Sequence, residues 1–191
     1  MLANKLCAQS AKDFWRSIEE FKPDVVVVMN RAPTRNIPID ARGMASDAIY
    51  IELSQNLQRL DKIVKKVFIL QALPLYANPM EAVMKRQEKG IPLDDTMEET
   101  LKLDHKPMRN RLNELAKNCE KCVLFDLHNR HLNKEGKYTV MHPNTHIQYF
   151  EESFHHTPYG WRLIAPVFEK LNQNFHRLIK AKKYPDNILE W

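Results

Sequence analysis

The stretch that decides the fold is Asp24–Asn30, which reads "DVVVVMN". Four consecutive valines show no alternation of polar and apolar residues, so this segment predicts a strand covered on both faces, as in a parallel sheet. Two later runs are of the same kind: "KVFILQALP" at Lys66–Pro74 and "CVLFDLHN" at Cys122–Asn129. We expect one parallel sheet that contains Val25–Met29, Val67–Leu70 and Val123–Phe125.

Helical patterns separate these runs along the chain. Before the first run, Phe14, Ile18 and Phe21 recur on one helical face, and Ser10 is a plausible N-cap. Residues 46–66 also place apolar side chains at helical spacing before the second run.

The last helix has a clear start at Thr157, a favourable N-cap, followed by Pro158 at the first helical position. Its apolar side chains are expected to pack on the sheet. They are Trp161, Ile164, Phe168, Leu171, Phe175 and Leu178.

Alternating helices and strands predict an α/β fold, a three-layer α/β/α sandwich around the parallel sheet. The chain has 191 residues, which fit a single domain, 1–191, with one core. The polar segment 77–118 is expected to be a helical insertion of two or three surface helices, broken at Gly90–Pro92 and at Pro107. In parallel sheets reactive groups gather at the carboxyl ends of the strands.

The composition narrows the class of protein. Hydrophobic residues make up 43% and charged residues 28% of the chain, which is ordinary for a globular domain. No apolar run approaches the roughly 20 residues that span a bilayer, and the first residues lack a signal-peptide core. The net charge of +5 permits a nucleic-acid partner, but no motif for one is present, so no nucleic acid is expected.

The cysteines and histidines are the candidate metal ligands of the chain. Cys119 and Cys122 form a single CxxC, whereas a structural zinc site needs four ligands. A pair of reduced thiols and a disulfide both remain open for these cysteines, because the compartment decides between them. The histidines of the loop-rich part show no regular ligand spacing, so neither a metal nor a cofactor is expected; they are His128, His131, His142, His146, His155 and His156.

Glu152 and His155 form an E-x-x-H pair just before the last helix. A carboxylate in this position can accept a hydrogen bond from the imidazole, fix its tautomer and stabilise the imidazolium, as in a Ser-His-acid triad. The alternative is two solvated side chains beside an N-cap.

The surrounding block, "YFEESFHHTPYGWRLIAPVFEKL", resembles the last sequence block of SGNH (GDSL-type) hydrolases. It is most similar to the SGNH domains at the C-terminal end of acyltransferase family three membrane proteins, especially nematode ones. Glu152 stands where that block has Asp, His155 stands on the catalytic His, and His156 stands on a Leu. Thr157, Pro158 and Gly160 match the family.

The same resemblance extends to two earlier segments. "KPDVVVVMNR" is similar to the family's middle strand, and "CEKCVLFDLHNRHL" to its cysteine pair and the strand that follows. The resemblance implies that Asn30 or Arg31 is an oxyanion donor and that Cys119 and Cys122 are disulfide-bonded. It also implies a lumenal or extracellular site beside an acyltransferase membrane domain in full-length relatives.

Two departures from the family matter. Glu152 replaces an aspartate, and the first strand with its Gly-Asp-Ser nucleophile turn has no counterpart. The resemblance implies O-acyl transfer or ester hydrolysis on a glycan or similar alcohol, but we expect this chain alone to be inactive without its nucleophile. The alternative is a non-catalytic binding or interaction domain that retains the fold.

Loss of a strand would leave an exposed sheet edge. None of the serines follows a strand; Ser10, Ser17, Ser46 and Ser54 lie in helical patterns, and Ser153 lies between Glu152 and His155.

Overall fold

The computed structural model describes residues 2–29, 37–76, 78–103, 105–151, 155–182 and 188–189. Its centre is a parallel sheet in the order β1-β2-β5-β8. The three strands predicted from the apolar runs are confirmed: β1 (Val25–Val28), β2 (Lys66–Leu70) and β5 (Cys122–Phe125). The two-residue strand β8 (Ile188–Leu189), which pairs with β5, was not predicted.

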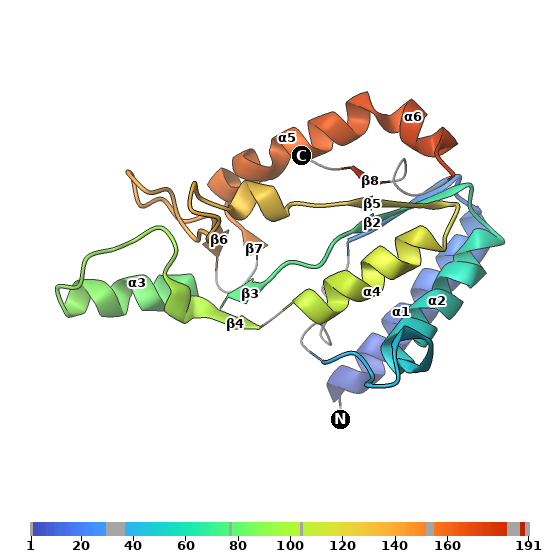
Figure 1. Ribbon diagram of the computed structural model, residues 1–191, viewed down its shortest axis with the longest axis horizontal. Helices are drawn as coiled ribbons and strands as arrows, with labels where there is room; N and C mark the ends of the chain where they lie inside the picture. Colours follow the sequence, from blue (N-terminus) through green and yellow to red (C-terminus); the bar gives the residue numbers. More distant parts are fainter. Residues whose placement is uncertain are drawn as a thin grey trace.

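Helices cover both faces of the sheet, as Figure 1 shows. On one side lie α1 (Leu2–Phe21), α2 (Ala48–Asp61) and α4 (Lys106–Lys117), and on the other lie α5 (Pro158–Gln173) and α6 (Phe175–Lys180). The three-layer α/β/α sandwich expected from the sequence is therefore confirmed.

Alternate residues of each strand point to opposite layers, which divides the core into two clusters. Towards α1, α2 and α4, the strand residues Val67, Ile69 and Leu124 pack with Leu60 and Ala116. Towards α5 and α6, the cluster contains Phe68, Val123, Phe125, Ile164, Val167 and Leu178.

The first helix differs from the expectation. It begins at Leu2 and runs through Ser10, so Ser10 is not its N-cap. Residues such as Ala3, Leu6 and Ala8 upstream of Ser10 are compatible with a helix, and no breaker precedes it. Ile18 is buried as expected, but Phe21 is 75% exposed.

The last helix begins as predicted. Thr157 is the N-cap, and its Oγ1 accepts a hydrogen bond from the Gly160 N–H at 3.0 Å. The apolar stripe is divided between α5 and α6, because α5 ends at Gln173. The expectation that Trp161 packs on the sheet is wrong. Its side chain is 50% exposed at the start of α5, where the ring lies beside the His156 ring.

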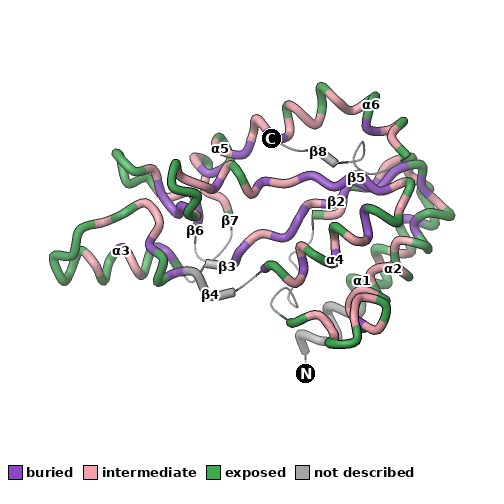
Figure 2. The backbone as a smooth tube through the Cα atoms, in the orientation of Figure 1, coloured by how far each residue is buried: buried purple, intermediate pink, exposed green. Residues whose placement is uncertain are grey.

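The segment 77–118 contains two helices with different surroundings (Figures 1 and 2). The first, α3 (Pro79–Glu88), extends away from the sheet and is mostly exposed. The second, α4, packs on the sheet through Leu112 and Ala116, so it is not the surface helix expected from the sequence. Between them lie η2 (Glu98–Thr100) and β4 (Leu101–Leu103), which pairs antiparallel with β3 (Leu75–Tyr76).

Candidate functional site

A two-strand hairpin stands directly before α5. Its strands β6 (Phe150–Glu151) and β7 (His155–His156) are antiparallel, with Glu151 opposite His155 and Phe150 opposite His156. Thr157 fixes the hairpin to the helix, because its N–H donates to the Tyr149 carbonyl at 3.0 Å and its Oγ1 to the Gln148 carbonyl at 2.7 Å.

Gly160 permits this close approach of the hairpin and α5. A Cβ atom at position 160 would lie 2.0 Å from the Tyr149 carbonyl oxygen, which no side chain can tolerate. The glycine that matches the family block is therefore required by the packing here, and it keeps β7 against the first turn of the helix.

The two adjacent histidines have opposite surroundings. His155 is exposed, whereas His156 is half-buried, as the alternation of side chains in a strand requires. His155 is therefore accessible to a reacting group. The predicted partner, Glu152, and the predicted oxyanion donors, Asn30 and Arg31, lie outside the described residues, so their contact with His155 stays a prediction.

His156 belongs to an aromatic group in which His131 and Phe150 are buried. Its Nε2 lies 3.3 Å from the Nε2 of His131, and its ring packs on Phe150 and Trp161. Burial lowers the pKa of His156 to about 4 and that of His131 to about 3. Both imidazoles are therefore neutral at pH 7, so His156 can fill a position that is apolar in the resembling block.

The described serines are not placed as nucleophiles. Ser10 and Ser17 lie within α1, Ser54 lies within α2, and Ser46 lies in the short helix η1 (Met44–Ser46). The Ser17 hydroxyl donates to the Asp13 carbonyl of its own helix at 2.8 Å. None of these four is at the carboxyl end of a strand, and Ser153 lies outside the described residues.

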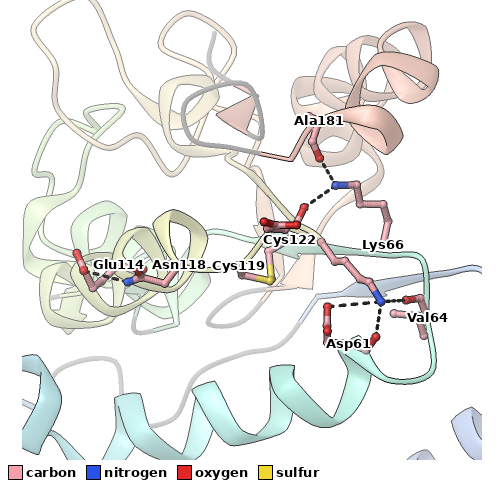
Figure 3. The surroundings of a disulfide bond; sticks show 10 residues. Asp61, Val64, Lys66, Glu114, Asn118, Cys119, Cys122 and Ala181 are labelled. Carbon is pink, nitrogen blue, oxygen red and sulfur yellow. Dashed lines mark hydrogen bonds and ion pairs between the residues drawn. A yellow bond between two sulfur atoms is a disulfide. The ribbon is translucent and has the colours of Figure 1, made fainter.

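The disulfide implied by the family resemblance is present between Cys119 and Cys122, whose Cα atoms are 5.3 Å apart (Figure 3). It stands at the amino end of β5. Two lysines hold the turn that it closes. Lys66 Nζ donates to the carbonyls of Glu120 and Ala181, and Lys121 Nζ donates to the carbonyls of Asp61 and Val64. This end of the sheet is opposite to the one where reactive groups are expected, so the disulfide has a structural role.

In the described part of the chain, no group of three or more His, Cys, Asp or Glu side chains could hold a metal ion. The structure also contains a group of polar side chains that was not expected from the sequence. In it, the Tyr138 hydroxyl lies between the rings of His105 and His128. The only sequence signal is that Asp126 and His128 directly follow a buried strand.

A protein-family model described as the SGNH domain fused to AT3 domains matches residues 2–170. The chain belongs to this SGNH family. The family description associates the domain with AT3, the acyltransferase domains of its relatives. No curated protein and no solved structure gives a significant match. Among the described helices of this SGNH domain, none has the length and apolar character needed to cross a membrane.

Proposed function

We propose that His155 and Glu152 are the acid–base half of an SGNH-type acyl-transfer site. The reaction class is O-acyl transfer or ester hydrolysis on a glycan or similar alcohol, on the lumenal or extracellular side of a membrane in full-length relatives. The observation that carries the proposal is the exposed His155 on a hairpin fixed to the capped start of α5. The proposed domain extends over 1–191, and the insertion expected at 77–118 ends in α4, which packs on the sheet.

In this mechanism His155 takes the proton of a serine hydroxyl as the oxygen attacks an ester carbonyl, and later gives it to the leaving alcohol. Glu152 orients the imidazole and stabilises its protonated form. Asn30 or Arg31 donates hydrogen bonds to the oxyanion of the tetrahedral intermediate. None of the serines that the structure describes stands at the carboxyl end of a strand, so we propose that the chain is inactive alone.

The nucleophile is proposed to belong to a further strand that pairs with the free side of β1. Among the described strands β1 lies at the edge of the sheet, paired only with β2. Val27 is 52% and Met29 49% exposed there, although strands of parallel sheets are usually covered on both faces. A strand bearing Gly-Asp-Ser beside β1 would cover this edge and carry its serine to the carboxyl ends of the strands.

A second candidate is a non-catalytic binding domain that uses the same surface. The half-exposed Trp161 favours it, because its indole ring lies against the hairpin that carries His155. An exposed tryptophan offers a large, rigid contact area for a ligand. In this case His155 would be a contact residue only.

The acid–base pair is tested by the tautomer of His155, measured by long-range ¹H–¹⁵N NMR. We expect the proton on the ring nitrogen that faces Glu152, and Glu152→Gln should abolish this preference. Glu151→Gln is the matched control, because Glu151 is the residue opposite His155 in the hairpin. An unchanged tautomer in Glu152→Gln, or a change caused by Glu151→Gln instead, would contradict the pair and favour the binding domain.

Inactivity of the chain alone is tested separately by hydrolysis of p-nitrophenyl acetate. Wild type and His155→Ala should hydrolyse the ester at the same background rate, because His155 has no serine to activate. His176→Ala is the control and should show this rate too, since His176 is exposed on α6 and remote in sequence from His155. Turnover lost in His155→Ala but kept in His176→Ala would contradict the proposed inactivity and show that His155 takes part in the hydrolysis.

A further inference from the structure

A polar network fixes the main chain at the carboxyl ends of β2 and β5. Arg109 of α4 donates to the Ala72 carbonyl at 3.0 Å and forms an ion pair with Asp126. Asp126 Oδ1 also accepts the His128 N–H at 2.8 Å, at the start of η3 (His128–His131). The position of His128 is therefore set by two strand ends and a helix together.

The side chain of His128 is the outer member of a hydrogen-bonded chain of three residues. Its Nδ1 is bonded to the Tyr138 hydroxyl, which is also 2.9 Å from His105 Nε2. The Tyr138 ring is nearly perpendicular to both imidazoles, at 88° and 80°. Tyr138 is positioned by an isolated antiparallel β-bridge between its main chain and that of Leu132. His105 is positioned as the N-cap residue of α4.

Proton counting limits the chain to two arrangements. The Tyr138 hydroxyl has one proton, so it donates to one imidazole and accepts from the other. If it donates to His105 Nε2, both imidazoles carry their proton on Nδ1. If it donates to His128 Nδ1, both carry it on Nε2. The tautomers of His105 and His128 are therefore coupled through Tyr138.

The surroundings of Tyr138 and His128 favour the neutral form of both side chains. Burial raises the pKa of Tyr138, which keeps its proton. Burial and the nearby Arg109 lower the pKa of His128, against a smaller opposing effect of Asp126. His128 Nε2 has no hydrogen-bond partner within the described ranges, and the side chain is partly exposed.

We propose that His128 is a second acid–base site of this domain, whose Nε2 exchanges a proton with a hydroxyl group of water or of a polar ligand. When Nε2 takes a proton, the Nδ1 proton moves to the Tyr138 oxygen and the Tyr138 proton moves to His105 Nε2. The positive charge then rests on His105, and His128 and Tyr138 are neutral again. The site does not depend on His155 or on any serine.

Diethyl pyrocarbonate tests the reactivity of Nε2, because it attaches to an unprotonated imidazole nitrogen and the second ring nitrogen must then release its proton. Tyr138 can accept that proton. Peptide mass spectrometry should show His128 reacting at pH 7, with its rate reduced on the order of tenfold in Tyr138→Phe. The rate at His176 is the internal control and should not change. An equal or faster rate at His128 in Tyr138→Phe would overturn the proposal.

The coupled tautomers give a second test that no change in accessibility can mimic. Long-range ¹H–¹⁵N spectra of the wild type should show His105 and His128 in the same tautomer, and Tyr138→Phe should abolish this correspondence. A well-dispersed spectrum of that variant establishes that it is folded. Opposite tautomers in the folded wild type would contradict the proton relay.

Discussion

The strands β5 and β1 are both four-residue apolar segments of one sheet, yet their burial is very different. All four residues of β5 are buried, whereas in β1 only Val26 is buried and Val27 is 52% exposed. In the described sheet β5 has strands on both sides and β1 on one. A continuous apolar run therefore identifies a strand, but it does not show whether the structure covers it.

Because β5 lies between other strands, its side chains take part in the core on both faces of the sheet. Phe125 and Val123 contact α5 and α6 residues in one cluster, and Leu124 joins the cluster of the opposite layer. Even a polar side chain that follows β5, His131, is buried. The β1 edge instead leaves apolar side chains in solvent, which favours another segment or partner there.

The largest expected effect is that of Phe125→Ala. Phe125 is fully buried and packs edge-to-face on Phe168, so removal of the ring should lower the free energy of unfolding by about 3–5 kcal/mol. Urea unfolding monitored by circular dichroism measures it. Phe21→Ala is the control, with a loss below about 1 kcal/mol expected because Phe21 is exposed. Similar losses in the two variants would show that Phe125 contributes no more to stability than an exposed phenylalanine.

The same substitution in both strands tests the contrast directly. Val123→Ala removes methyl groups from a fully buried position, and we expect a loss of about 2–3 kcal/mol. Val27→Ala should cost less than about 0.5 kcal/mol. A large loss from Val27→Ala at low protein concentration would show that Val27 is covered, contrary to the structure.

Acid sensitivity should arise on the β5 side through His131 and His156. Each has a folded pKa below the ordinary 6.5, so the unfolded chain binds protons first, and stability falls as pH decreases from about 6.5 towards 4. For a pKa of about 4, the loss between pH 7.5 and pH 5 is about 2 kcal/mol.

His156→Leu should remove roughly this part of the pH dependence, since leucine cannot be protonated. Urea unfolding of wild type and variant at both pH values measures the difference. An identical pH dependence in the two proteins would show that His156 is not held neutral by burial.

The central strands and the start of α5 could be predicted because their signals are local. Consecutive β-branched residues mark β1, and Thr157 followed by Pro158 marks a helix start. The strand β8 carries only two residues, Ile188 and Leu189, and nothing in so short a segment separates a strand from a loop.

The candidate site could be predicted only in part. The E-x-x-H pair and the family block point to His155, and strand alternation explains its exposure, but its pairing with Glu152 stays a prediction. The chain of His105, Tyr138 and His128 could not be predicted, because its members come from separate segments that the fold brings together. Helical periodicity placed Trp161 on an apolar face, but it carries no information on how far the sheet extends beneath that face.

We propose that this SGNH domain retains the family's acid–base histidine, His155, but has no activated serine for it to serve. Intact-mass spectrometry after incubation with a fluorophosphonate probe distinguishes the two cases, because the probe attaches to an activated serine. We expect no adduct on the folded chain. A single adduct on a serine, absent when His155→Ala is treated in the same way, would show that the chain has its own nucleophile.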